Sequence, residues 1–274
     1  MNYRHAFHAG NHGDVFKHAA LTLVLDWLLA KPAPFAVLDT HAGLGVYHLT
    51  SDEARRTGEA IHGAQRVFGR VLKSAPSYSR LLAEMNPASL ALYPGSPEIV
   101  LRMVRPEDRL IACELHPDDA ETLRRRYRSD PHIAVHHRDG YEAVGAFVPP
   151  AERRGLVLID PPFEAKDEAE RLARTLAAGL RKWPTGTYLA WYPIKDYGIS
   201  ETLAAAAGAT SFPKTLRVEF LPYHRDGSIM AGSGLIICNA PWRLDEQLSA
   251  LCEELNPLLS DGSATWRVDW LTKA

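Results

Sequence analysis

Short apolar runs recur along the chain, and four of them end in an acidic residue or are followed by one within two residues. Four such runs, at residues 35–39, 110–114, 133–137 and 156–159, are largely apolar without the strict alternation of a half-exposed strand. Near-continuous apolar runs of this length are typical of parallel strands that are buried on both faces. The pattern therefore predicts an α/β fold with a parallel sheet at its centre.

The C-terminal half continues the pattern and adds a change of direction. Residues 167–182 have helical spacing, and residues 187–192 read as a fifth strand. Residues 215–221 and 234–239 are two further strands with no helix between them, so we expect them to pair antiparallel. The whole pattern predicts one domain, residues 1–274, with a mixed seven-stranded sheet whose last strand is antiparallel.

Acidic side chains stand at four successive strand ends: Asp39, Glu114, Asp139 and Asp160. Taken singly, each is equally well explained as a turn residue or a helix N-cap. Together they would line the carboxyl edge of the sheet, where open α/β sheets bind their ligands. Glu114 suits the two hydroxyls of a ribose, and Asp139 could accept a hydrogen bond from an adenine amino group.

A glycine turn, Thr-His-Ala-Gly-Leu-Gly at residues 40–45, follows the first strand. It lacks the third glycine of a dinucleotide fingerprint, so alone it is a weak indicator of a nucleotide. In dinucleotide-binding folds, the acidic residue that binds the ribose lies about 20 residues beyond the glycine turn. In this chain Glu114 lies much further beyond the turn. We therefore predict a helical insertion at residues 50–92, either a grip for a substrate or only an extension of the fold.

Asp160-Pro161-Pro162-Phe163 directly follows the fourth apolar run and carries the most specific chemistry. The Asp160 carboxylate and the Pro161 carbonyl can each accept one hydrogen from a ring amino group, and the fixed φ of proline directs that carbonyl. Phe163 would stack on the ring, a contact worth about 1–3 kcal/mol with a nucleobase. Such a tetrapeptide also occurs as a plain turn. At the crevice it predicts alkylation of a nitrogen such as adenine N6.

Several segments together resemble one enzyme family. The first is YRHAFHAGNHGDVFKH at residues 3–18, and the others are residues 38–43, 93–97, 114–117, 139–140, 191–193 and 239–242. With the tetrapeptide, they make the chain resemble class I S-adenosylmethionine-dependent methyltransferases, and more closely the bacterial 23S ribosomal RNA adenine-N6 methyltransferases of the RlmJ family. Two positions depart from that family, since many members have Tyr at Phe163 and Pro at Ala240. Phenylalanine keeps the stacking face and loses only a hydroxyl.

The resemblance implies a Rossmann-like methyltransferase fold, S-adenosyl-L-methionine as cofactor and 23S ribosomal RNA as substrate. By this resemblance, seven residues contact the cofactor: His18, His41, Ser96, Glu114, Asp139, Gly140 and Asp160. Asp160 is also the catalytic carboxylate, with Pro161 and Phe163 beside it. Near the N-terminus, the residues implied on the RNA side are Tyr3, His5 and Lys17.

Composition adds little for or against RNA. The chain has 31 Lys and Arg against 33 Asp and Glu, a formal net charge of -2, which is unusual for a protein that binds RNA through its phosphates. The arginine-rich run at residues 124–128 is more typical of a solvated helix face than of a binding patch. Three widely spaced cysteines indicate neither disulfides nor zinc. Without an apolar run near the ~20 residues that span a bilayer, we expect a cytoplasmic protein that does not bind membranes.

Four histidines near the N-terminus raise the question of a metal: His5, His8, His12 and His18. A catalytic zinc normally needs three protein ligands, and no third ligand accompanies His8 and His12. Gly10 and Gly13 also argue against a regular helix here. We therefore expect no metal and a polar N-terminal segment that folds over the active site. Nothing in the sequence demands a partner chain, so we expect a monomer.

Three alternatives remain open at this point. Asp-Pro-Pro does not distinguish RNA from DNA, so a DNA adenine-N6 methyltransferase is the nearest, although no groove-reading helix-turn-helix is recognisable. A non-catalytic RNA-binding protein on the same fold is the second. A small-molecule or protein-amide methyltransferase is the third, and the latter usually has Asn in place of Asp160.

Overall fold

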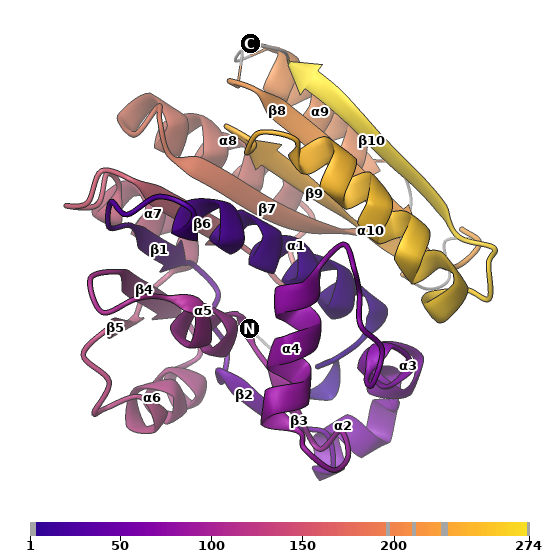
Figure 1. Cartoon of the computed structure of the whole chain (residues 1–274). Helices are drawn as coiled ribbons and strands as arrows, with labels where there is room; N and C mark the ends of the chain where they lie inside the picture. Colours follow the sequence, from indigo (N-terminus) through magenta and orange to yellow (C-terminus); the bar gives the residue numbers. More distant parts are fainter. Residues whose placement is uncertain (1–3, 196–197, 210–211, 226–229, 273–274) are drawn as a thin grey trace.

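A twisted sheet with helices on both faces forms the centre of the chain (Figure 1), described here from a computed structural model that covers residues 4–195, 198–209, 212–225 and 230–272. Its eight strands lie in the order β10-β8-β9-β7-β6-β1-β4-β5. The strands are β1 (Ala36–Asp39), β4 (Arg109–Glu114), β5 (Ile133–His137), β6 (Gly155–Ile159), β7 (Thr187–Ile194), β8 (Thr215–Leu221), β9 (Gly232–Cys238) and β10 (Thr265–Thr272). From β5 to β7 the strands are parallel, whereas β9 is antiparallel to both neighbours and β10 is antiparallel to β8.

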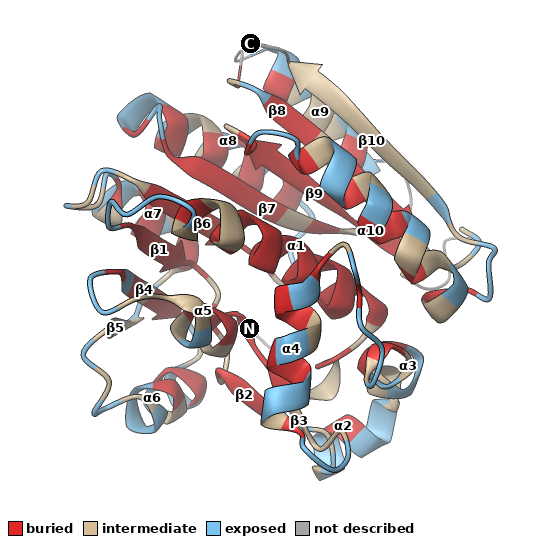
Figure 2. Cartoon of the chain, viewed as in Figure 1, coloured by how far each residue is buried: buried red, intermediate tan, exposed pale blue. Residues whose placement is uncertain are grey.

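The sheet is buried between two helical layers. The principal helices are α1 (His12–Leu29), α5 (Ser96–Met103), α6 (Pro117–Arg126), α7 (Gly140–Phe147), α8 (Glu168–Lys182), α9 (Gly198–Ala209) and α10 (Leu244–Leu259). One face of the sheet packs against α1, α5 and α10, and the other packs against α7, α8 and α9 (Figure 1). On β6, Leu156 and Leu158 belong to the first core, while Val157 and Ile159 belong to the second. Figure 2 shows the central strands as buried, which explains their continuous apolar runs.

The strands predicted from the sequence are confirmed to within one or two residues, including the antiparallel pairing of β8 and β9. The count of seven strands was wrong, because β10 adds an eighth strand at the edge. This strand is only partly buried, and Trp266, Val268 and Trp270 alternate along it toward α10 and the first core. Such alternation is the sequence signal of a half-exposed strand.

The N-terminal segment holds a second correction. Gly10 has a φ of +80° and lies outside any helix, but Gly13 lies within the first turn of α1. Asn11 caps this helix, because its side chain accepts a hydrogen bond from the Asp14 backbone N–H at 2.9 Å. Most of α1 is buried, so its sequence is apolar on nearly all sides and lacks helical periodicity.

Residues 50–92 contain four short helices. These are α2 (Asp52–Thr57), η2 (Glu59–His62), α3 (Ala64–Val67) and α4 (Pro76–Met85). They lie between β2 (Val46–His48) and β3 (Leu92–Pro94), which pair antiparallel. The helix α4 packs on α1, and the N–H of Ala64 donates to the Gly10 carbonyl at 2.7 Å, so the group is joined to the N-terminal segment. Within the described ranges, no helix combines the length and apolar character needed to cross a membrane.

We predict that Gly155→Ala severely destabilises the fold. Gly155 has a φ of +151°, and an added Cβ would lie 1.8 Å from the Ala36 carbonyl oxygen of the neighbouring strand. The expected loss in free energy of unfolding, measured in urea, is about 3 kcal/mol or more. Gly145→Ala in α7 is the matched control, since nothing lies within 4 Å of its added Cβ. That change should stabilise the protein by about 0.5–1 kcal/mol, and equal effects at both sites would refute the argument.

Candidate functional site

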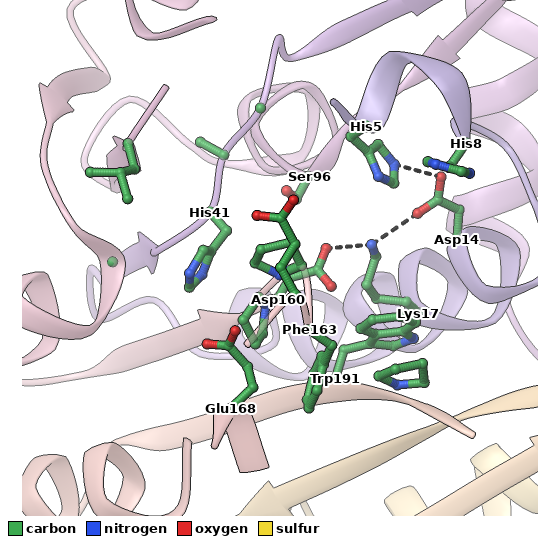
Figure 3. Close-up of a pocket in the computed structure, with 18 of the residues that line it drawn as sticks. His5, His8, Asp14, Lys17, His41, Ser96, Asp160, Phe163, Glu168 and Trp191 are labelled. Carbon is green, nitrogen blue, oxygen red and sulfur yellow. Dashed lines mark hydrogen bonds and ion pairs between the residues drawn. The ribbon is translucent and has the colours of Figure 1, made fainter. Parts of the chain in front are cut away.

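A pocket of about 850 Å³ opens at the carboxyl edge of the sheet (Figure 3). Its walls come from the ends of the parallel strands β1, β4, β5, β6 and β7 and from the start of α1. The predicted residues that line it are His5, Lys17, His18, His41, Ser96, Glu114, Asp139, Gly140, Asp160, Pro161 and Phe163. Tyr3 lies outside the described residues. Chain topology therefore brings into one pocket residues that are far apart in the sequence.

A buried chain of charges joins the start of α1 to the end of β6. Lys17 Nζ donates to Asp14 Oδ1 at 2.9 Å and also to Asp160 Oδ2. Asp14 Oδ2 in turn is 2.9 Å from His5 Nε2 and accepts from the Gly10 N–H at 2.8 Å. Burial alone would lower the pKa of Lys17, but the charges of Asp14 and Asp160 outweigh it and raise that pKa. Lys17 is therefore an ammonium that holds Asp160 from one side.

Sequence reasoning missed Asp14. Its desolvation would raise the pKa of its carboxyl, but the charges of His5 and Lys17 outweigh burial and keep that pKa well below its usual range. The sequence did contain a signal for this ion pair. Asp14 and Lys17 are spaced i, i+3, and the residues that follow them are mostly apolar.

Asp160 also faces an aromatic corner. Its Oδ1 has no hydrogen-bond partner within the described ranges, in contrast to Oδ2. The Phe163 ring lies edge to face with Trp191, with centroids 6.1 Å apart (Figure 3). Phe163 has a φ of +51°, a backbone conformation that is rare and strained for a bulky side chain. The fold thus maintains a strained residue where the tetrapeptide meets the pocket.

The acidic residues at the other strand ends are firmly held. Glu114 accepts the N–H groups of Gly43 and His116, each at 2.8 Å, and its burial raises the pKa of its carboxyl. Asp139 caps α7 through Oδ1, which accepts from the Tyr141 N–H at 2.8 Å. Its Oδ2 binds Arg171 at 2.7 Å. Asp139 is therefore a helix N-cap that also lines the pocket, and its role toward a ligand stays a prediction.

Asp39 departs from the expectation that all four acids line the crevice. It is fully buried and lies outside the pocket lining. Burial raises the pKa of its carboxyl to about 7, despite a hydrogen bond with Ser96. The strand β1 ends before its neighbours, because its last residue pairs with Ala112 of β4 and Leu158 of β6. His41 and Gly43, which follow β1, therefore line the pocket in place of Asp39.

The helix α8 supplies two charged pocket residues that the sequence did not reveal. Glu168 accepts the Tyr141 hydroxyl hydrogen at 2.6 Å, and the Arg171 guanidinium lies 4.2 Å from the Tyr141 ring centroid. Both residues stand in the first turns of the helix, three positions apart, and so share one face. They became recognisable only once α8 was placed against α7.

Ion pairs tie the N-terminal segment down beside the pocket. Arg4 pairs with Asp119 of α6 at 2.7 Å, and His8 pairs with Glu59 of η2 at 2.7 Å. Asn11 donates to the same Glu59 at 3.0 Å. The described parts of the chain contain no group of three His, Cys, Asp or Glu placed to hold a metal ion.

These features fit a nucleoside cofactor that carries positive charge. Among the residues that line the pocket, carboxylates outnumber Lys and Arg, and Glu114 keeps lone pairs for hydroxyl donors. The backbone also approaches closely, because an added Cβ on Gly140 would lie 2.2 Å from the Thr40 carbonyl oxygen. Gly43 has a φ of +60°, which suits glycine at a tight turn. Several residues that could hold such a cofactor are His18, His41, Ser96, Glu114, Asp139 and Gly140.

Comparison with known proteins gives consistent matches. A family model described as Ribosomal RNA large subunit methyltransferase D, RlmJ, matches residues 32–272. Two proteins named Ribosomal RNA large subunit methyltransferase J are similar over 99% of this chain and 99% of their own length, at 36% identity in Haemophilus influenzae and 37% in Escherichia coli.

Solved structures that match this fold include the following two. A protein from Legionella pneumophila is 32% identical, with a TM-score of 0.88 over 96% of this chain and 98% of its own. A probable spermidine synthase from Corynebacterium glutamicum shares only the fold, with 14% identity and a TM-score of 0.50 over 94% of this chain and 75% of its own.

Buried histidines predict a loss of stability in acid. Burial lowers the pKa of His12 to about 4, that of His18 to about 3 and that of His41 to about 4. In the unfolded chain these groups take up protons below about pH 6.5. Between that pH and about 4 the unfolded state binds more protons, so stability falls as pH falls.

The contribution of one histidine can be measured separately. In His12→Gln, the fall in free energy of unfolding between pH 6.5 and 4 should be shallower than in the wild type, by at most about 1.4 kcal/mol per pH unit. Urea titrations at several pH values give this difference. The same substitution at exposed His62 is the control and should leave the slope unchanged. A wild-type slope in His12→Gln would contradict the assignment.

Proposed function

Because the chain belongs to the RlmJ family of ribosomal RNA large subunit methyltransferases, we propose that it transfers a methyl group from S-adenosyl-L-methionine to N6 of a specific adenine in 23S ribosomal RNA. Similarity over nearly the whole length of two ribosomal RNA methyltransferases supports the substrate class. A ribosomal RNA substrate also agrees with a cytoplasmic place of action.

One observation carries the proposed chemistry: the two oxygens of Asp160 differ in their surroundings. Lys17 occupies Oδ2, whereas Oδ1 has no partner within the described ranges. The adenine N6 lone pair is delocalised into the ring, so the amino group needs acceptors that localise it. Asp160 Oδ1 and the Pro161 carbonyl oxygen supply two acceptors on one short segment. Holding the amino group in this orientation would account for much of the rate enhancement.

The aromatic corner receives the target base. We infer that the adenine leaves its stack in the RNA and enters the pocket, as base-modifying enzymes require of paired substrates. Phe163 then stacks on the base. Trp191 supports the Phe163 ring through an edge-to-face contact, with the two ring centroids 6.1 Å apart. Stacking of this kind orients a base without reading the surrounding sequence.

The opposite half of the pocket holds the cofactor, which when bound supplies an electrophilic methyl group on sulfur. Glu114 has both oxygens fixed by backbone N–H groups, so its remaining lone pairs are preorganised for the ribose hydroxyls. The acidic lining also favours the positive charge of this cofactor. Asp139 is already bound to Arg171, so we assign the recognition of the cofactor adenine to Asp139 and Arg171 together.

His5 and Lys17 take part on the RNA side of the pocket by the same proposal, as does Tyr3. Both partners of Lys17 are carboxylates, so we infer that Lys17 acts by holding Asp160. His5 contacts Asp14 and the edge of Tyr47, with ring centroids 5.1 Å apart. It therefore joins the buried charges to Tyr47 in the pocket wall.

Asp160→Asn should abolish methyl transfer while the protein stays folded. With radiolabelled S-adenosylmethionine and 23S RNA transcribed without modifications, the wild type should form N6-methyladenine. The variant should be slower by about 10²-fold or more, the usual cost of losing an electrostatic group at the reacting atom. Asp167→Asn is the matched control, because this exposed carboxylate stands near α8 and outside the pocket. Labelling of DNA of the same sequence instead of RNA would overturn the substrate class.

Phe163→Ala and Phe163→Tyr separate stacking from the rest of the site. The alanine variant loses the ring and should reduce kcat/KM for RNA by about 10- to 100-fold, given a stacking energy of about 1–3 kcal/mol per base. The tyrosine variant keeps the ring and should retain activity near that of the wild type. Calorimetric binding of S-adenosylhomocysteine should be the same in both. Retained activity in Phe163→Ala would exclude stacking as the role of this residue.

A further inference from the structure

A row of three buried side chains runs from the helical insertion to the pocket. Tyr78 of α4 and Tyr93 of β3 have their hydroxyl oxygens 3.1 Å apart. The Tyr93 hydroxyl is in turn 3.0 Å from Nδ1 of His18 on α1, and the rings of Tyr93 and His18 are stacked with centroids 5.6 Å apart. Tyr78 and Tyr93 are fully buried, and His18 is 2% exposed.

The direction of these hydrogen bonds follows from counting protons. The row contains two hydroxyl hydrogens and two contacts, and burial raises the pKa of both tyrosines, so both hydroxyls stay protonated. Tyr78 contacts only Tyr93 within the row, so its hydrogen must be donated to the Tyr93 oxygen. Tyr93 then has one acceptor left, which is Nδ1 of His18. Any other arrangement leaves a buried hydroxyl hydrogen without an acceptor, which is energetically unfavourable.

The proton of His18 therefore resides on the other ring nitrogen. Burial lowers the pKa of His18 to about 3, so the ring is neutral at pH 7 and carries one N–H. With Nδ1 accepting from Tyr93, that hydrogen is on Nε2. Nε2 has no hydrogen-bond partner within the described ranges, and His18 lines the pocket.

We propose that Tyr93 is a positioning residue that holds His18 in the Nε2–H tautomer, so that the pocket presents a hydrogen-bond donor to an oxygen acceptor of the bound cofactor. The identity of that ligand rests on the proposed function, whereas the tautomer does not. Tyr78, on the helical insertion, donates to the Tyr93 oxygen and is not itself needed to fix the tautomer.

The tautomer is measured directly by ¹⁵N NMR of the full-length protein labelled at histidine, without any ligand. In the wild type, the His18 shifts should show an unprotonated Nδ1 and a protonated Nε2. A protonated Nδ1 would overturn the proposal without the need for any variant. In Tyr93→Phe the acceptor role of Nδ1 is lost, so both shifts should move toward those of a tautomer mixture. Wild-type shifts in Tyr93→Phe would also overturn it.

Tyr78→Phe is the matched control, because it removes a buried hydroxyl from the same row. Tyr93 still has only Nδ1 as an acceptor in that variant, so the His18 tautomer should stay as in the wild type. A general disturbance of packing would instead affect the two variants alike, and that result would refute a specific role for Tyr93.

Ligand binding tests which group of the cofactor accepts the hydrogen bond from His18 Nε2. By calorimetry, Tyr93→Phe should bind S-adenosylhomocysteine about 3- to 10-fold more weakly than the wild type, as for the loss of one hydrogen bond. 5′-Methylthioadenosine lacks the amino-acid end: a loss confined to S-adenosylhomocysteine assigns the acceptor to the carboxylate, and an equal loss for both ligands assigns it to the nucleoside. Unchanged binding of both would overturn the role toward the cofactor. Failure of the wild type to bind either ligand would instead remove the proposed function and leave the NMR result standing.

Discussion

The rest of the site depends on the ion pairs of Lys17, which is buried between Asp14 and Asp160. Burying the Lys17 ammonium without a carboxylate would be strongly disfavoured, and so would burying a carboxylate without the ammonium. Removing one partner from such a group typically costs about 3–5 kcal/mol. The arrangement therefore ties the first turns of α1 to the end of β6, and it fixes one oxygen of the Asp160 carboxylate in the pocket.

The position of α1 follows from this constraint. The helix contacts β7 and β9 of the sheet as well as α4, α5 and α10, so it is the common neighbour of the core and the insertion. One turn of it presents Asp14, Lys17 and His18 to the pocket. Residues on a rigid, fully packed helix are held more accurately than residues on a loop. The carboxyl edge of the sheet and the helical insertion therefore meet at a single rigid element.

Much of the fold and part of the site were accessible from the sequence. Buried parallel strands leave continuous apolar runs, and the acids that follow them mark the carboxyl edge, so Glu114, Asp139 and Asp160 could be named in advance. Glu168 and Arg171 of α8 and Asp14 of α1 could not be named as pocket residues, because a charged residue in a helix is ordinary until its neighbours are known. The strand β10 was missed for the opposite reason, since its alternating pattern at a sheet edge was readable but was not recognised.

The sequence by itself determined seven strands of the sheet, the order of its acidic strand ends and the tetrapeptide to which we assign the chemistry, because these depend on local patterns of burial and on rigid backbone residues. Only the tertiary structure decided which side chains became partners. Lys17 lies 143 positions from Asp160, and His18 lies 75 positions from Tyr93. Pairings over such separations follow from how α1 packs between the sheet and the insertion, and no local pattern encodes them.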